Sequence, residues 1–192
     1  CRMARLPYIH IDNGYFKAGF PDGYYRITKN AERIYKGSVF TNQRFLELKI
    51  QPQPFRDGET VVICAPSELG CYATPYDKLT PKEFIDSMRA WIAANLGERR
   101  IVVTHKQGGE YRLEDVIHNA HIVLGCSSNT VIDALLYGVR AYDMAPWLGE
   151  PWVHGHAALW ADWREAYFAV LANAQMKLSE FTRERIENAC YS

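Results

Sequence analysis

The stretch from Val116 to Met144, VIHNAHIVLGCSSNTVIDALLYGVRAYDM, contains the clearest structural pattern in the chain. Residues 122–126 (IVLGC) form a short apolar run of the kind seen in a strand that is buried on both faces. Ser and Asn, which are preferred N-cap residues, follow this run. Apolar residues then recur at helical spacing until Gly138, a typical helix end. Residues 139–144 (VRAYDM) return to an extended pattern. The stretch therefore predicts strand, polar turn, helix and strand, which is one βαβ crossover.

The polar turn of this crossover, residues 127–130 (SSNT), is the first candidate binding site. Backbone N–H groups without partners and the positive end of the helix dipole meet at a helix start, and phosphate is the anion most often bound there. The candidate phosphate ligands are Ser127, Ser128, Asn129 and Thr130. A second interpretation stays open, because a serine before an apolar run is also the ordinary cap of a helix that binds nothing.

The composition is that of an ordinary soluble globular protein. The chain has 192 residues, of which 48% are hydrophobic and 23% charged, enough for one well-buried domain with part of another. Its 22 basic and 22 acidic residues balance, so no global field draws it to nucleic acid or to an anionic membrane. A local basic patch is an alternative that stays open. No apolar run approaches the roughly 20 residues that span a bilayer, and no signal-peptide pattern is present. Five cysteines without a CxxC pair indicate a reduced compartment and no structural zinc. These features together predict a cytoplasmic protein.

The rest of the second half continues the alternation of strands and helices. Thr80, Pro81 and Glu83 form a clear helix start. The expected order is strand 61–65, helix 81–96, strand 101–104, short helix 113–119, strand 122–126, helix 129–137 and strand 139–144, followed by amphipathic helices over 161–177 and 179–189. This order predicts an α/β fold with a doubly wound, Rossmann-like parallel sheet. The predicted division is an N-terminal region, 1–56, and an α/β domain with C-terminal helices, 57–192.

Polar residues at the carboxyl ends of the predicted strands are the next candidates, because ligands of open parallel sheets bind at that edge. Ser67 and Glu68 follow the strand at 61–65, and His105 and Lys106 follow the next one. A His and a Lys at this edge can meet a diphosphate or a carboxylate. The alternative is that they are solvated edge residues. Pairs of histidines at 118 and 121 and at 154 and 156 lack a third ligand nearby, so no metal site is expected.

Asp12 ends the first predicted strand, LPYIHI at 6–11, at an Asp-Asn-Gly turn. If that strand joins a parallel sheet, its carboxylate lies at the ligand edge and is a candidate for catalysis. The alternative is that Asp12 only forms the turn. Residues 24–28 (YYRIT) are extended and are expected to pair with a neighbouring segment, which brings Arg26 into the same region.

The order of elements resembles the nucleotide-sugar-binding half of GT-B glycosyltransferases. More narrowly, THK at 104–106 and AHIVLGCSSNTVIDALLYGVRAYDM at 120–144 are similar to capsular-polysaccharide transferases and to glycosyltransferase-like proteins of bacteriophages. In that pattern a His-containing strand edge precedes a V…S…EAL..G.PV block, and Asp133 stands where the block usually has Glu. Residues 9–30 and 171–175 also resemble segments of the phage proteins. The resemblance implies a GT-B-like C-terminal domain with a truncated N-terminal part.

The same resemblance implies a glycosyltransferase that requires no cofactor or metal. It would move a sugar from a nucleotide-sugar donor, expected to be a UDP-sugar, to a hydroxyl of a saccharide or, in a phage, of a hydroxymethylated DNA base. Asp12 would be the general base, and Arg26, His105, Lys106 and the amides of 127–130 would stabilise the departing diphosphate. Asp133 would contact the ribose or the sugar. Ser67 and Glu68 would line the donor cleft, and a homo-oligomer is compatible with this hypothesis.

A second hypothesis belongs to another functional class. The chain would be a non-catalytic α/β module that binds a nucleotide or a sugar. The sheet alone does not separate the two hypotheses, because function depends on the site and not on the fold. Turnover of a nucleotide-sugar donor separates them.

Overall fold

The computed structural model describes residues 9–17, 22–29, 42–68, 80–105, 111–126, 129–143, 159–173 and 175–186. The chain divides into two compact units. Unit 1 consists of residues 1–50 and 162–192, and unit 2 of residues 51–161. Within the described residues, no helix is long and apolar enough to cross a membrane.

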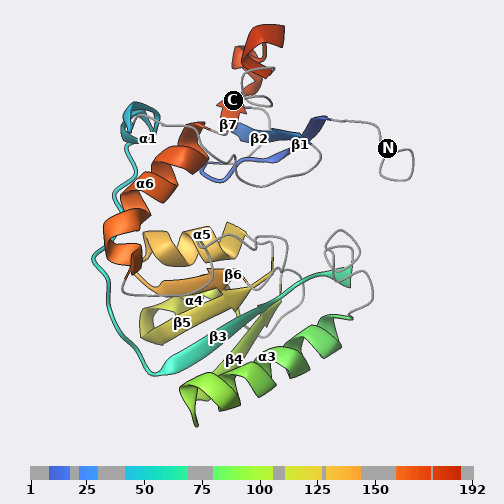
Figure 1. Ribbon diagram of the computed structural model, residues 1–192, viewed down its shortest axis with the longest axis vertical. Helices are drawn as coiled ribbons and strands as arrows, with labels where there is room; N and C mark the ends of the chain where they lie inside the picture. The colour runs from blue at the N-terminus through green and yellow to red at the C-terminus, as the bar shows by residue number, and fades with distance from the viewer. Residues whose placement is uncertain are drawn as a thin grey trace. The chain divides into compact units, whose positions relative to one another are not determined.

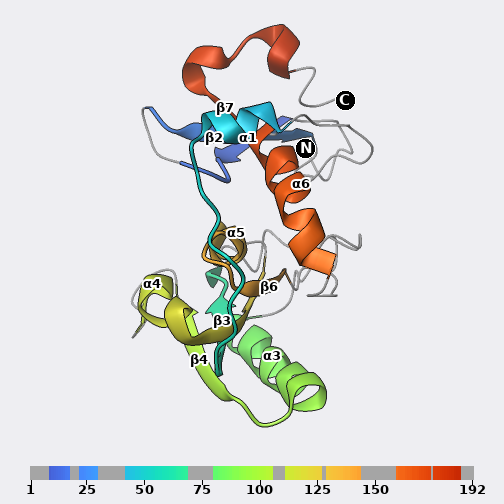
Figure 2. The ribbon, with the colours of Figure 1, turned by 90° about the vertical axis from the view of Figure 1, so that its left-hand side faces the viewer.

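Unit 2 is built on a parallel sheet of four described strands: β3 (Thr60–Ala65), β4 (Arg100–His105), β5 (Ala120–Gly125) and β6 (Arg140–Asp143). The strand order is β4-β3-β5-β6, and all three pairings are parallel. Helix α3 (Pro81–Leu96) covers one face of the sheet and α5 (Asn129–Leu136) the other (Figures 1 and 2). The predicted α/β class with a Rossmann-like parallel sheet is confirmed.

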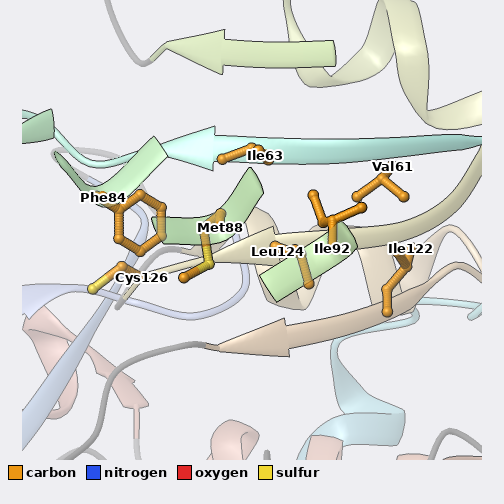
Figure 3. Packing of buried hydrophobic residues seen from close by; sticks show 8 residues of the cluster. All are labelled: Val61, Ile63, Phe84, Met88, Ile92, Ile122, Leu124 and Cys126. Carbon is orange, nitrogen blue, oxygen red and sulfur yellow. The ribbon is translucent and has the colours of Figure 1, made fainter. Parts of the chain in front are cut away.

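The core of unit 2 follows from the apolar runs of its strands. Every residue of β3 is buried, as expected for a central strand of a parallel sheet. One face of β3 and β5 packs against α3, as Figure 3 shows. The residues of this cluster are Val61, Ile63, Phe84, Met88, Ile92, Ile122, Leu124 and Cys126. Thr80 caps α3 as predicted, since its hydroxyl accepts from Glu83 N at 3.2 Å while the Glu83 carboxylate accepts from Thr80 N at 2.6 Å.

Between β4 and β5 the chain forms helix α4 (Leu113–Val116) and a 3-10 turn, η1 (Ile117–Asn119). These two elements correspond to the short helix predicted over 113–119. Leu113 and Ile117 are buried. The crossover from β3 to β4 and the crossover from β4 to β5 run in opposite directions along the sheet, and right-handed crossovers then lie on opposite faces.

Unit 1 contains a separate antiparallel sheet. Its described strands are β1 (Ile9–Asn13), β2 (Tyr24–Lys29) and β7 (Gln175–Lys177), in the order β1-β2-β7. The same unit includes α1 (Gln43–Glu47), most of α6 (Leu159–Asn173) and a 3-10 turn, η3 (Leu178–Glu180). The helix predicted over 161–177 therefore stops at Asn173. Residues 162–192 group with unit 1 and not with the α/β domain, because β7 pairs with β2.

Unit 1 has its own aromatic core. The Phe45 ring lies 5.4 Å from Phe16 and 5.3 Å from Phe168, measured between centroids. The side chain of Gln175 at the start of β7 is 1% exposed, and its Oε1 accepts a hydrogen bond from Phe16 N at 2.8 Å. The C-terminal strand therefore satisfies a buried backbone donor of the N-terminal segment.

Replacing Gln175 by Leu is expected to lower the free energy of unfolding of unit 1 by about 1–3 kcal/mol, because the buried Phe16 N–H loses its acceptor. Urea denaturation measures the change. The matched control is Gln43→Leu on α1, where the glutamine is exposed and the expected change is within about 0.5 kcal/mol. Equal losses in the two variants would contradict a structural role for the Gln175 amide.

Candidate functional site

The strand order of unit 2 fixes where a ligand would bind. The first strand, β3, lies between β4 and β5, so the chain moves in opposite directions along the sheet after β3 and after β4. Such a reversal is a topological switch point, and open α/β sheets bind ligands in the crevice beyond the carboxyl ends of the two strands concerned. Here these strands are β3 and β5, which end at Ala65 and Gly125.

Gly125 brings the next helix close to this crevice. A Cβ atom at residue 125 would lie 2.7 Å from Cγ2 of Val131 and 3.8 Å from the Thr130 hydroxyl oxygen. Because no side chain stands at this position, the first turn of α5 packs directly on the end of β5. Asn129 and Thr130, the first residues of α5, are half-buried at this point. Ser127 and Ser128 lie outside the described residues.

A buried thiol lies under the helix start. Cys64, one residue before the end of β3, is 5% exposed. The Thr104 hydroxyl on β4 donates to its Sγ at 3.4 Å, and the Thr130 hydroxyl also hydrogen-bonds it. Burial raises the pKa of the Cys64 thiol, so the thiol stays neutral at ordinary pH. The two hydroxyls and the thiol connect β3, β4 and α5 at the carboxyl edge.

Asp133 is the acidic residue of this site. It lies on the second turn of α5, near enough to Cys64 for its charge to raise the thiol pKa. Burial, and then the charge of Glu114 on α4, raise the pKa of the Asp133 carboxyl to about 6. No described cation offsets these two effects. A carboxyl group held in this way at a ligand edge is a common feature of functional sites.

The other predicted residues of unit 2 lie at the same edge of the sheet. His105 is the last residue of β4 and pairs in register with Ala65, and its side chain is exposed. Ser67 and Glu68 follow β3 and are exposed as well. Lys106 lies outside the described residues. The carboxyl edge thus brings together His105, Ser67 and the start of α5 at the level of the backbone.

Asp12 does not belong to the parallel sheet, although its candidate catalytic role assumed that it does. Strand β1 pairs antiparallel with β2, with Asp12 opposite Arg26, and both belong to the unit 1 sheet. The first strand is therefore not part of the parallel sheet, and the edge rule for parallel strands does not apply to it. The structure describes the backbone of Asp12 and not its side chain. Arg26 is half-buried, with its guanidinium carbon 5.6 Å from the centre of the Tyr15 ring.

No metal centre is found in the part of the chain that the structure describes, because no three His, Cys, Asp or Glu side chains converge there. The His121 ring belongs to a different contact. Its Nδ1 lies 2.5 Å from Oδ1 of Asp57, at the opposite, amino edge of the sheet. This hydrogen bond from His121 holds the pKa of Asp57 below its usual value.

Sequence reasoning missed Cys64, Thr104 and Glu114 as parts of this site. Cys64 and Thr104 stand inside apolar runs and were assigned only to strands. Their partnership depends on the register Cys64↔Thr104, which the sequence does not reveal. Glu114 lies on the short helix α4, and the sequence does not reveal that this helix packs near Asp133.

Comparison with known proteins adds no assignment: no protein-family model and no curated protein sequence matches this chain.

Proposed function

We propose that the carboxyl edge of unit 2 binds a nucleotide-sugar and that the chain is the donor-binding part of a GT-B-like glycosyltransferase. The observation that carries the proposal is the switch point between β3 and β5, with α5 beginning directly beyond β5. This arrangement combines a crevice with the amides and the positive dipole end of a helix, which is what a nucleotide diphosphate requires.

The described residues suggest a role for each part of the donor. The diphosphate lies against the backbone amides of Asn129 and Thr130 and accepts a hydrogen bond from the Thr130 hydroxyl, whose oxygen accepts the S–H of the neutral Cys64 thiol at the same time. His105 stands at the neighbouring strand end. The Asp133 carboxyl accepts hydrogen bonds from hydroxyls of the ribose or of the transferred sugar. Hydrogen bonds from these hydroxyls would replace the hydrogen bonds with water that the carboxyl loses on burial. Electrostatic stabilisation of the leaving diphosphate then comes from helix amides and side chains, without a metal ion.

The acceptor side of the reaction is assigned to unit 1. Asp12 is proposed as the base that takes the proton from the acceptor hydroxyl. The acceptor is a saccharide or, in a phage, a hydroxymethylated DNA base. These assignments are supported by the resemblance of residues 9–30 to the phage proteins.

The helix-start part of the proposal is tested by Thr130→Val, which removes one hydroxyl and keeps the shape of the side chain. UDP is expected to raise the melting temperature of the parent protein, because a ligand that binds only the folded state stabilises it. The variant should bind UDP at least about 10-fold more weakly by calorimetry, since about 1.4 kcal/mol of hydrogen bonding is lost. Thr60→Val, the same change at the amino end of β3, is the control and should leave UDP affinity unchanged.

Turnover then separates the enzyme from the binding module. The protein is incubated with a panel of nucleotide-sugars and saccharide or hydroxymethylated DNA acceptors, and released nucleotide diphosphate is measured. Release that depends on the acceptor supports the transferase. Nucleotide binding without release on any acceptor would support the non-catalytic module. A protein that binds no nucleotide diphosphate would reject the proposed site.

A further inference from the structure

The two units have opposite net charges, although the whole chain is neutral. Residues 1–50 and 162–192 contain 13 of the 22 basic side chains and nine of the 22 acidic ones, whereas residues 51–161 contain nine basic and 13 acidic side chains. Unit 1 therefore has a net charge of +4 and unit 2 of −4. Such segregation is a property of the sequence, and it concentrates attraction for anions on unit 1.

Two described cations of unit 1 lie over the ring of Tyr24 at the start of β2. The Arg44 guanidinium carbon lies 5.3 Å from the centre of the Tyr24 ring, and Lys177 Nζ lies 5.5 Å from it. Lys177 also pairs with Tyr24 in the β2–β7 register. The backbone oxygen of Lys17 accepts from Tyr24 N at 3.1 Å, which places Lys17 beside the same residue. Arg185, which donates to Glu180 of η3, is the fourth cation at this end of the antiparallel sheet.

One carboxylate at this end is outnumbered by the cations. Glu180 accepts two hydrogen bonds from Arg44, at 2.9 and 2.5 Å, and a third from Arg185 at 3.2 Å. Its Oε2 also accepts from Lys177 N at 2.7 Å. These contacts, led by the hydrogen bond from Arg44, lower the pKa of Glu180 to about 2. Among the described residues, Glu47 is a second acid in contact with the group, 3.8 Å from Arg44. The carboxylates position the cations and do not neutralise all of them.

The outermost of these cations are available to a partner. The side chains of Lys17 and Lys177 are exposed, and Arg185 is 56% exposed. Arg185 touches Glu180 through one of its nitrogens, Nη1. Beside them, Tyr24 on β2 is a half-buried aromatic residue. Several cations beside an aromatic side chain are typical of a surface that binds a single nucleic-acid strand.

We propose that the end of the unit 1 sheet formed by Lys17, Tyr24, Lys177 and Arg185 is a docking surface for a single-stranded nucleic acid. The cations contact successive phosphates, so binding is not specific for sequence. An acidic glycan would satisfy the charges too, but it offers no flat base to Tyr24. This surface does not depend on the donor site of unit 2, so either can fail without the other.

The test uses the full chain and a fluorescein-labelled oligothymidylate of about 20 nucleotides, long enough to cover a site of the size that such surfaces occupy. Fluorescence anisotropy is recorded as a function of salt. The double variant Lys17→Gln, Lys177→Gln is compared with Lys82→Gln, Arg89→Gln, which removes two exposed cations from α3 of unit 2. A third variant, Lys17→Arg, Lys177→Arg, keeps the charges.

The unit 1 variant is expected to bind about tenfold more weakly and to reduce the slope of log K against log salt by about 1.4, which corresponds to two lost phosphate contacts on a single strand. The α3 variant and the Arg variant should bind like the parent. The proposal would be overturned if the unit 1 variant had the same affinity and the same salt slope as the parent. It would also be overturned if the α3 variant lost as much affinity as the unit 1 variant. Displacement of the oligonucleotide by hyaluronate at the same concentration of charge would overturn the choice of nucleic acid.

Discussion

Replacing Asp133 by Asn is expected to stabilise the folded protein at neutral pH and to weaken its binding of a nucleotide-sugar. The folded state raises the pKa of Asp133 from 3.8 to about 6, through burial and then through Glu114. The folded protein therefore binds this proton more tightly than the unfolded chain does. Stability from this group is fully present below about pH 4 and is lost as the pH rises through about 6. Above that pH the folded state holds a carboxylate in a poor environment.

The size of this cost follows from the shift. Two pKa units correspond to about 3 kcal/mol, and partial solvent exposure reduces this to about 1–2 kcal/mol. Urea denaturation at several pH values measures it: the gain of Asp133→Asn over the parent should be small at pH 4 and should reach its maximum above pH 7. Asp86→Asn on α3 is the control with the opposite sign, because a hydrogen bond from Lys82 lowers the pKa of that exposed carboxyl. A parent and an Asp133→Asn variant with the same pH profile would contradict the assignment.

The second part of this prediction concerns affinity: Asp133→Asn is expected to bind a nucleotide-sugar more weakly than the parent protein does. An amide in place of the carboxylate still accepts one hydrogen bond but has no charge, so hydrogen bonds from two sugar hydroxyls become weaker. A gain in stability together with a loss of nucleotide-sugar affinity is the pattern of a residue retained for binding. A gain in stability with unchanged affinity would remove Asp133 from the donor site.

Local sequence signals were sufficient to predict the elements of unit 2. The Thr80–Glu83 capping box is contained within four residues, and the apolar run of β3 is visible without its neighbours. The structure has α3 at the predicted residues, and β3, β4, β5 and α5 within about two residues of their predicted ends. The right-handed crossover rule then leaves few topologies, so the parallel sheet could also be predicted.

Strand β7 could not be predicted for a different reason. Gln175–Lys177 continues the amphipathic pattern of α6, and nothing local distinguishes it from a further helical turn. Its extended form depends on hydrogen bonds to β2, which lies about 150 residues earlier in the chain. The orientation of β1 is a property of the same kind. Because Asp12 was selected from an assumed parallel orientation, the error in sheet topology became an error in the argument for the site.

The residues of the candidate site also divide into those with a local sequence signal and those whose roles depend on distant contacts. The start of α5 is predicted from a pattern of nearby residues, and Asp133 from the resemblance of residues 120–144 to capsular-polysaccharide transferases. The register that places Thr104 beside Cys64 and the position of Glu114 depend on how distant segments pack. Residues whose roles depend on cross-strand neighbours are therefore found only with a structure.

The end of α5 provides the prediction with the largest expected effect on stability. Gly138 has a φ of 72°, and a Cβ there would lie 2.0 Å from the backbone oxygen of Pro54. The segment containing Pro54 cannot move away freely, because Gln53 N donates to Leu136 O at 2.8 Å and Arg56 N donates to Gly138 O at 2.9 Å. Gly138→Ala must therefore strain the backbone, break these hydrogen bonds or both.

We expect Gly138→Ala to lower the free energy of unfolding by about 2–5 kcal/mol, the sum of about 1–2 kcal/mol for a left-handed alanine and about 1–3 kcal/mol for the steric conflict. Gly97→Ala at the end of α3 is the matched control. Gly97 has nearly the same φ, 69°, but no atom lies within 4 Å of its added Cβ. Its cost should be the backbone part alone, about 1–2 kcal/mol. The difference between the two variants in urea denaturation isolates the contact between residues 53–56 and the end of α5. If both variants lose the same free energy, that contact does not hold the amino edge of unit 2 together.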